Sequence, residues 1–330
     1  MKKVMALLLI FVLALSMVGC GNNAKEEESS YDKETISVAA LKGPTALGML
    51  KMMEDQEKGE TPDNYEFELA GAADEILGRI IQGEIDIAAV PVNVASVLYN
   101  KTEGKVQLLA VNTLGVLYML EDGETLTSMN DLKGQTIYTT GQGSTPEYVL
   151  RYILSQNNID PDNDVTIEYK SEASEVAALI QKKEAKIAML PQPFVTTVMA
   201  QNEGLRVVFD ITEEWAQVGN GSELTQGCVV VQKAFAEEHP EAVERFLKAY
   251  QESVDYVNGN AEEAGTLAEK FGIIAKAAVA AKAIPNCNIV FLTGEQMKNA
   301  AGGFLSVLFE ANPQAVGGNL PADDFYYGVN

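Results

Sequence analysis

The stretch Ile85-Asp86-Ile87-Ala88-Ala89-Val90-Pro91 recurs 100 residues later as Ala185-Lys186-Ile187-Ala188-Met189-Leu190-Pro191. Each copy is a short apolar run that ends at proline, which is typical of a buried strand ending at the carboxyl edge of a sheet. The match extends outward without a gap. Over residues 43–56 and 73–91, 11 of 33 positions are identical to those 100 residues later, where unrelated sequence would give roughly two or three. The pattern indicates an internal repeat, with coincidence between two common strand–helix units as the alternative.

Each half of the repeat alternates extended and helical segments. The β-rich runs at residues 35–41 and 136–140 are both followed by a glycine-containing turn and an amphipathic stretch. Alternating β and α segments predict a parallel sheet covered by helices, and 330 residues with 47% apolar content suffice for two cores. The predicted fold class is therefore α/β, with two lobes, each a mainly parallel sheet flanked by helices. Because ligands bind at the carboxyl edge of such sheets, a cleft is expected between the lobes.

Two polar, turn-rich segments, residues 128–134 and 219–227, are expected to carry the chain between the lobes. The helical remainder beginning at Ala234 then completes the first lobe. The predicted divisions are a signal peptide (1–19), a lipidated flexible tether (20–34), the first part of lobe 1 (35–131), lobe 2 (132–224) and the second part of lobe 1 (225–330).

The N-terminus has the pattern of a secretion signal. Lys2 and Lys3 precede an apolar run at residues 4–15, which is too short to span a membrane as a stable helix. Cys20 directly follows Gly19 and resembles the modified cysteine of a bacterial lipoprotein signal. The sequence therefore predicts an extracytoplasmic protein held at the outer side of the cytoplasmic membrane only through lipid on Cys20. An ordinary signal peptide with an incidental cysteine is the alternative.

The charge and the cysteines limit the partners. A net charge of -23 argues against nucleic acid and anionic lipid surfaces, since both are bound mainly through clustered lysine and arginine. Cys228 and Cys287 form one disulfide or remain two small buried residues, and the sequence leaves both readings open. We expect a monomer.

Two glycine-containing turns at the starts of helices supply the first ligand-binding candidates. Glycine lets the backbone approach a ligand closely, and helix starts favour anions. Ser144 and Glu147 also fit a capping box, so plain helix capping is the alternative reading. The candidates in these turns are Gly43, Pro44, Thr45, Gly143, Ser144 and Thr145.

Further candidates come from polar residues next to apolar strands. Asn93 and Gln192 follow the two repeated prolines, so the repeat places them opposite each other across the cleft. Asn112 and Thr113 interrupt an apolar run at residues 108–120 that otherwise reads as one buried strand. Polar groups there need partners, and a solute is one candidate; a turn or bulge between two strands is the alternative reading.

The chain's only tryptophan, Trp215, precedes the second passage between the lobes. Its ring could stack on a planar ligand, and ordinary packing under a loop is the alternative.

The expected binding loops contain no Arg, His, Asp or Glu, and Lys42 is their only basic residue. A solute recognised by an arginine fork is therefore disfavoured. We expect a neutral polar molecule, including a heteroaromatic one, or a compact anion held by backbone N–H groups and hydroxyls. The loops concerned are residues 41–46, 91–94, 111–115, 140–146 and 190–194.

Catalysis has little support in the sequence. The single histidine, His239, lies at an expected helix entrance, and no spacing of His, Cys, Asp and Glu suits a metal or a cofactor. We predict no enzyme activity, no cofactor and no metal. The alternatives are a secreted enzyme on the same fold acting on a small heteroaromatic substrate, and a surface scaffold lipoprotein without a transport role.

Three motifs carry a resemblance to a known family. Asp131-Leu132-Lys133-Gly134, Gly141-Gln142-Gly143-Ser144-Thr145 and Pro191-Gln192-Pro193-Phe194, in this order, resemble the nitrate, sulfonate, taurine and pyrimidine-precursor group of ABC-transporter substrate-binding proteins. The resemblance runs from Ile36 to Asn330. It implies a type II periplasmic-binding-protein fold that closes over its solute by hinge bending and then docks on a membrane permease.

Overall fold

The computed structural model describes residues 31–71 and 74–329. Cys20, the predicted signal peptide and most of the predicted tether lie outside these residues. From Glu34 onward the chain forms one compact unit. Within the described residues, none of the helices has the length and apolar character needed to cross a membrane.

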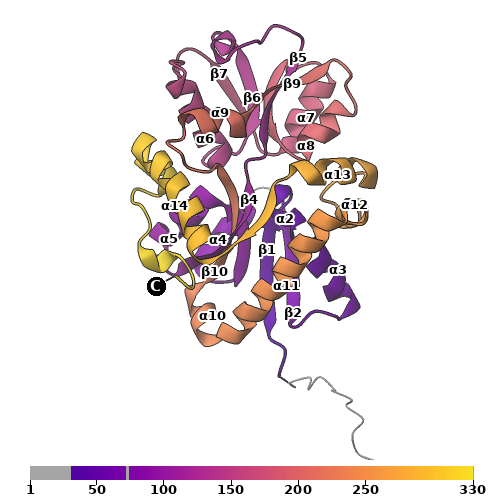
Figure 1. The fold of residues 1–330 in the computed structure, drawn as a ribbon, viewed down its shortest axis with the longest axis vertical. Helices are drawn as coiled ribbons and strands as arrows, with labels where there is room; N and C mark the ends of the chain where they lie inside the picture. The colour runs from indigo at the N-terminus through magenta and orange to yellow at the C-terminus, as the bar shows by residue number, and fades with distance from the viewer. Residues whose placement is uncertain (1–30, 72–73, 330) are drawn as a thin grey trace, which may run out of the picture. The chain divides into compact units, whose positions relative to one another are not determined.

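The described strands form two separate sheets (Figure 1). The six-stranded sheet has the order β2-β1-β3-β10-β4-β11 and the five-stranded sheet the order β7-β6-β8-β5-β9. The first comprises β1 (Thr35–Leu41), β2 (Asn64–Ala70), β3 (Ile87–Pro91), β4 (Val106–Leu114), β10 (Thr225–Gln232) and β11 (Ile289–Leu292). The second comprises β5 (Leu117–Asp122), β6 (Thr136–Thr140), β7 (Thr166–Lys170), β8 (Ile187–Pro191) and β9 (Leu205–Asp210).

The pairing of the strands reproduces the internal repeat. Strand β1 is parallel to both β2 and β3, and β6 is parallel to both β7 and β8. Val38 pairs with Ile87 in the first sheet, and Ile137 pairs with Ile187 in the second. The next strand is antiparallel in each sheet, β10 beside β3 and β5 beside β8. The α/β prediction of two lobes with similar sheets is confirmed.

The two halves of the repeat exchange one strand each. Strand β10 of the six-stranded sheet comes from the second half, and β5 of the five-stranded sheet comes from the first. The chain leaves β4 of the first sheet and enters β5 of the second through Gly115 and Val116, well before the predicted passage at residues 128–134. A Cβ atom on Gly115 would lie 2.1 Å from Thr212 Oγ1, so glycine allows this close passage. The return from β9 to β10 runs through a helix and then residues 219–224, inside the predicted segment 219–227.

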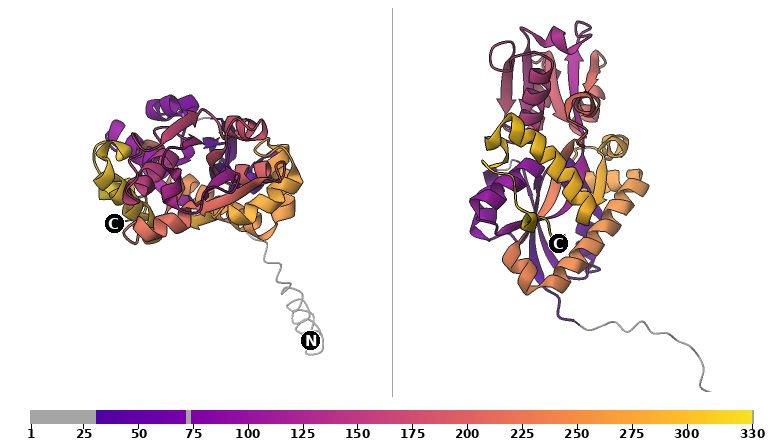
Figure 2. Two further views of the ribbon diagram at one scale, coloured as in Figure 1. Left: turned by 90° about the horizontal axis from the view of Figure 1, so that it is seen from above. Right: turned by 60° about the vertical axis from the view of Figure 1, so that its left-hand side comes forward.

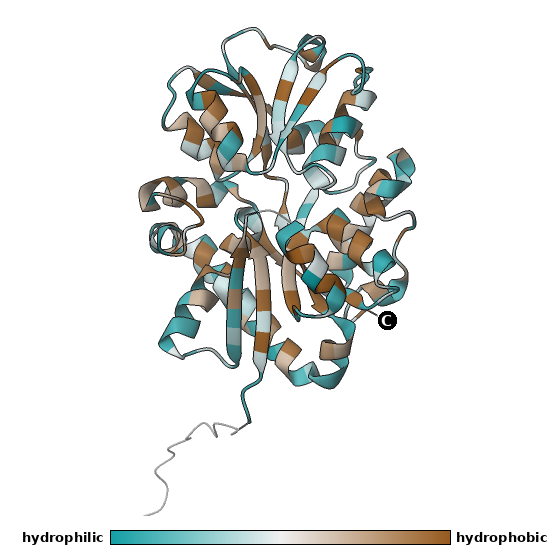
Figure 3. Cartoon of the chain, turned by 180° about the vertical axis from the view of Figure 1, so that it is seen from behind, coloured by the Kyte–Doolittle hydropathy of each residue, from teal (hydrophilic) through white to brown (hydrophobic). Residues whose placement is uncertain are grey.

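Helices cover both faces of the sheets, and the central strands are correspondingly hydrophobic (Figure 3). In β1, alternate side chains enter different cores: Ile36 and Val38 pack with α11, whereas Ala39 faces the core that includes α4 and α5. The helices of the six-stranded lobe are α2 (Pro44–Leu47), α3 (Leu50–Lys58), α4 (Asp74–Gln82), α5 (Val92–Lys101), α10 (Lys233–Glu238), α11 (Pro240–Gly259), α12 (Ala261–Lys270) and α13 (Ala277–Ala283). Those of the five-stranded lobe are α6 (Thr145–Gln156), α7 (Ala173–Gln181), α8 (Phe194–Met199) and α9 (Ile211–Val218).

The last long helix, α14 (Gly294–Ala311), contacts both lobes. It packs against α5 and β4 of the six-stranded lobe and against α6 of the five-stranded lobe. Figure 2 shows it lying across the level at which the two lobes meet. The C-terminal helical region therefore supports the junction as well as the first lobe.

Candidate functional site

A cleft of about 900 Å³ lies between the lobes and is lined by residues from both. Its walls include the loops that follow β1, β3, β6 and β8, at the carboxyl ends of these strands. This is the sheet edge at which α/β proteins bind ligands. Gly272 and Ile273, between α12 and α13, add a further part of the wall that the repeat does not predict.

Five of the sequence-predicted ligand-binding residues line this cleft: Pro44, Thr45, Gly143, Ser144 and Thr145. The side chains of three of them are nearly covered, with Thr45 and Ser144 each 8% exposed and Thr145 0%. Gly43 does not line the cleft. Its φ of 145° is in the range that favours glycine, and a Cβ atom there would meet nothing within 4 Å.

The three hydroxyl groups in this set already donate hydrogen bonds within the protein. Thr45 donates to the Leu41 carbonyl at 3.1 Å, and Ser144 donates to the Gly141 carbonyl at 2.8 Å. Thr145 donates to Asn93 Oδ1 at 3.0 Å. Because a hydroxyl has one proton, these side chains offer lone pairs to the cleft rather than donors.

The start of α6 differs from the predicted capping box. Glu147 accepts a hydrogen bond from the Gly143 N–H at 2.6 Å, while the Ser144 side chain makes no capping bond to its helix. Gly141 and Gly143 have φ values of 78° and 75°, and this tight turn brings the Ser144 hydroxyl to the Gly141 carbonyl. The helix start therefore already holds a carboxylate of its own chain.

Asn93 and Gln192 do not face each other across the cleft. Asn93 is fully buried, and its Nδ2 donates to the Ala315 carbonyl at 3.0 Å while its Oδ1 accepts from Thr145. Gln192 is 5% exposed and accepts hydrogen bonds from the backbone and side chain of Thr196 at the start of α8. Gln192 holds local structure, Asn93 joins distant parts of the chain, and neither lines the cleft.

Asn112 and Thr113 lie beneath the cleft wall rather than in it. The register between β4 and β10 shifts around Gly227, which leaves Asn112 as an extra residue on β4, so the bulge reading fits. Asn112 Nδ2 donates to the Thr45 carbonyl at 3.1 Å, and the Thr113 hydroxyl donates to Asn112 Oδ1 at 3.0 Å. The pair supports the turn that carries Thr45.

Trp215 is 1% exposed and does not line the cleft, so the structure gives no support to stacking on a ligand. Its ring lies 5.2 Å, centroid to centroid, from both Tyr152 of α6 and Phe304 of α14. Its Nε1 donates to the carbonyl and the hydroxyl of Ser222 in the second passage. The residue is thus part of the packing at the junction of the lobes.

Lys42 lines the cleft from the expected loop after β1, whereas the other charged residues of the cleft come from segments that the sequence analysis did not include. Asp74, Glu75, Lys170 and Glu172 line it from the loops after β2 and β7. The loops are equivalent in the repeat: the Gly71 N–H donates to Glu75, and the Ser171 N–H donates to Glu175. A Cβ atom on Gly71 would lie 2.7 Å from Glu172 Oε1, so the two loops approach each other closely. The carboxyl-edge rule, applied to every parallel strand, would have included them.

Gln226 was also missed, although it lines the cleft from β10. The signal for it is Gly227, because glycine inside a strand marks a bulge or a close approach of backbones.

The groups with intrinsic chemical reactivity lie elsewhere. Cys228 and Cys287 are both free and buried, and burial raises the pKa of the Cys287 thiol to about 12. His239 Nδ1 lies 3.2 Å from Glu34 Oε1, next to the start of β1 and therefore at the opposite end of that strand from the cleft. Within residues 31–71 and 74–329, no group of three or more His, Cys, Asp and Glu could hold a metal ion.

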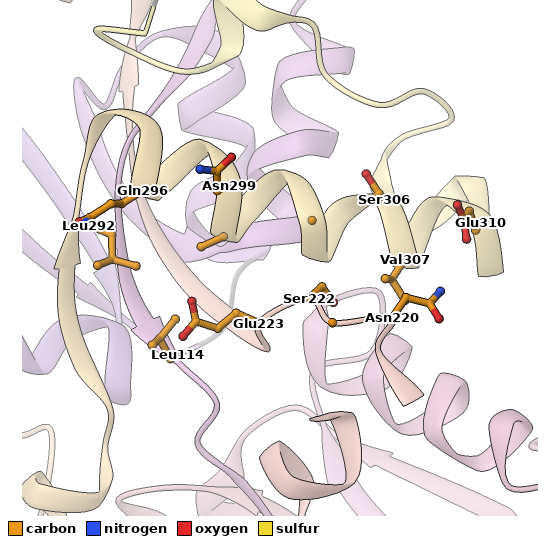
Figure 4. A pocket seen from close by; sticks show the side chains of 13 residues that line it. Leu114, Asn220, Ser222, Glu223, Leu292, Gln296, Asn299, Ser306, Val307 and Glu310 are labelled. Atoms are coloured by element: carbon orange, nitrogen blue, oxygen red, sulfur yellow. The ribbon is translucent and has the colours of Figure 1, made fainter. Parts of the chain in front are cut away.

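A second cavity, of about 750 Å³, lies between α14 and the passage at residues 219–224 (Figure 4). Asn220, Ser222 and Glu223 line it on one side, and Asn299 and Glu310 of α14 line it on the other. The passage therefore borders open space on its α14 side.

Known proteins match this chain in sequence and in fold. A family model described as NMT1/THI5 like matches residues 106–264. A binding protein from Brucella abortus (strain 2308) is 23% identical over 180 residues, 54% of either chain, so the chain spans about half the length of the curated relatives it matches.

Two solved structures cover most of the chain. An ABC transporter protein from Parabacteroides distasonis is 26% identical, with a TM-score of 0.73 over 88% of this chain and 98% of its own. The periplasmic aliphatic sulphonate-binding protein SsuA from Escherichia coli is 17% identical, with a TM-score of 0.68 over 89% and 96%. Residues 106–264 are thus similar to the NMT1/THI5-like family, and the fold of the chain is that of the periplasmic binding proteins of ABC transporters.

Proposed function

We propose that this protein is the solute-binding component of an ABC importer. It captures a small organic solute in the cleft between its lobes and delivers it to a membrane permease. The observation that carries the proposal is the cleft of about 900 Å³, lined by both lobes at the carboxyl edges of their sheets. The Escherichia coli structure with the same fold is a sulphonate-binding protein, which supports a transport role without naming the cargo of this chain.

Closure of the lobes follows from the connections between the sheets. The described chain passes between them at Gly115 and Val116 and again at residues 219–224, and the second passage borders the cavity beside α14. A solute that contacts both lobes binds the closed arrangement more tightly, so it shifts the population toward that arrangement. A permease can then distinguish the loaded form from the empty one.

The first test is a thermal-shift screen of the purified full-length chain against sulfonates, nitrate, pyrimidines, other heteroaromatics and amino acids. A solute present at about a thousand times its dissociation constant adds roughly 4 kcal/mol to the free energy of unfolding. We expect one class to raise the melting temperature and to make the protein more compact in small-angle scattering. No shift with any class counts against the proposal, and chemical turnover of a bound solute would favour an enzyme.

Attachment to the membrane forms a second part of the proposal. The protein is held, as a monomer, at the outer side of the cytoplasmic membrane by lipid on Cys20. In cells supplied with labelled palmitate, we expect the label in the membrane-bound protein. The Cys20→Ser variant should lose both the label and the membrane association. Label that persists in this variant would refute the anchor.

A further inference from the structure

Gln226 occupies an irregular position in the central part of the six-stranded sheet. Thr225 of β10 pairs with Leu114 of β4, but Gly227 pairs with Thr113, so Gln226 is an extra residue between two paired positions. The extra Asn112 on β4 restores the register one step later. Bulges re-aim side chains and are common beside binding sites. Here the bulge lies where β10 reaches the cleft.

The Gln226 amide makes no hydrogen bond that would explain its position. The residue is 8% exposed and lines the cleft, and among the described residues its Nε2 atom is buried without a partner. A buried polar group without a partner destabilises a protein, so such groups are uncommon and point to a missing partner.

The other polar groups of the cleft mostly accept hydrogen bonds. The protons of the Thr45, Ser144 and Thr145 hydroxyls are committed inside the protein. The Gly143 N–H is bonded to Glu147. The carboxylates of Asp74, Glu75 and Glu172 add further acceptors, and Lys170 lies 3.4 Å from Glu168. Lys42 and the exposed Gln142 also line the cleft and supply donors. The three carboxylates outnumber the two ammonium groups, so the charge of the walls disfavours an anion.

We propose that Gln226 is a specificity-determining residue that donates a hydrogen bond to an acceptor atom of the solute. The solute class is then an uncharged molecule that brings its own N–H or O–H donors to the acceptor-rich walls, rather than an oxyanion. The inference rests on the proposed solute-binding function. The solute acceptor would be the missing partner of the buried Gln226 amide. The donors of the solute would pair with the acceptors of the cleft walls.

The first test needs no solute. Gln226→Met in the full-length chain replaces the unpartnered amide by an apolar group of similar size. We expect the melting temperature of the solute-free protein to rise by about 2 °C. Gln251→Met, on an exposed glutamine of α11 outside the cleft, is the matched control and should leave it unchanged. A lower melting temperature for Gln226→Met would overturn the inference, because it would reveal a structural partner.

The second test compares neutral and anionic probes. Nicotinamide and uracil are neutral and carry N–H groups, whereas nicotinate and ethanesulfonate are anions. Titration calorimetry should detect binding of a neutral probe, weakened about tenfold by Gln226→Met. Gln226→Glu, which exchanges the donor for an acceptor, should abolish it, and the control Gln251→Glu should retain it. Binding of an anion with equal affinity in the wild type and both Gln226 variants would overturn the inference.

The two tests distinguish failure of the solute-binding function from failure of the proposed role of Gln226. If the wild type binds none of the four probes and shows no shift in the wider screen, the solute-binding function is refuted. The melting temperature of solute-free Gln226→Met is independent of that result, and a decrease in it refutes the role of Gln226 alone.

Discussion

The Thr145 hydroxyl donates a hydrogen bond to Asn93 Oδ1 at 3.0 Å, joining the start of α6 in one lobe to α5 in the other. Both side chains are fully buried. Asn93 also donates to the Ala315 carbonyl, so one amide ties together both lobes and the C-terminal segment. Separation of the lobes at this point would break a bond that water reaches poorly.

This bond predicts energetic coupling between the lobes. In a double-mutant cycle, Asn93→Ala and Thr145→Val should show a coupling energy of about 1 kcal/mol in urea unfolding. Thr45→Val is the control, because Thr45 donates to Leu41 within its own lobe. Its effect should add to that of Asn93→Ala within about 0.5 kcal/mol. Additivity in both cycles would mean that the bond between the lobes contributes nothing measurable.

Trp215 should report movement of the lobes without touching the solute. It lies outside the cleft, and its ring packs on Phe304 of α14 and Tyr152 of α6. A saturating solute is expected to change its emission because closure alters this contact. Phe304→Leu should bind the same solute with unchanged affinity and a smaller emission change. If the solute binds but the emission of the wild type stays the same, closure does not change the packing of Trp215 in α9.

Glu121 should make the stability of the five-stranded lobe depend on pH. Burial raises its pKa, but hydrogen bonds from Thr125, Leu126 and Arg206 outweigh burial and lower the pKa from 4.5 to about 2. The folded carboxylate therefore binds a proton less readily than the unfolded one. The stabilisation, roughly 3 kcal/mol, is present above about pH 4.5 and disappears as the pH falls toward 2.

The Glu121→Gln variant tests this dependence. Its free energy of unfolding should fall below that of the wild type at pH 7, and the difference should shrink between pH 4.5 and pH 2. Glu124→Gln, on an exposed neighbour, should show no such trend. A deficit in Glu121→Gln that stays constant over this range would contradict the assignment.

Gly227 should tolerate no side chain. A Cβ atom there would lie 2.6 Å from Thr45 Cγ2 and 2.7 Å from Asn112 Oδ1. Gly227→Ala is expected to lower the free energy of unfolding by about 1–3 kcal/mol, because one of these neighbours must move. Gly78→Ala lies in α4 with no atom within 4 Å of the new Cβ, and should raise it by about 0.5–1 kcal/mol. Equal effects in urea unfolding would contradict the packing around Gly227.

The repeat predicted more of the fold than any single segment could. Two runs that both end at proline, Pro91 and Pro191, became equivalent parallel strands in separate sheets. The passage between the sheets was misplaced, because the apolar run at residues 108–120 reads as one strand. Hydropathy shows that a strand is buried, but it does not show which sheet contains it. Only Gly115, inside that run, marks the change of sheet.

The sequence predicted where the cleft lies better than it predicted which groups of the cleft donate and which accept hydrogen bonds. The carboxyl-edge rule found the turns around Thr45 and Thr145, because it follows from the topology. The direction of a hydroxyl proton depends on a few backbone angles, which the sequence does not specify. Ser144 and Glu147 fit a capping box by spacing, yet the glycines before them direct both side chains to other partners.

The exchange of strands between the sheets also bears on how the chain acquires its structure. Strands β5 to β9 lie within residues 117–210, so the five-stranded sheet can assemble from one continuous segment. The other sheet must wait for β10, whose Cys228 thiol meets the Val90 carbonyl across 138 residues of chain. Among the described residues, β4 pairs with β10, with β11 and, through Leu108, with Tyr326, all of which follow it in the chain, so it has no sheet neighbour until β10 is made. During synthesis from the N-terminus, β4 is therefore made before its neighbours. Its unpaired, apolar edges stay exposed until β10 has been made, and such edges promote aggregation.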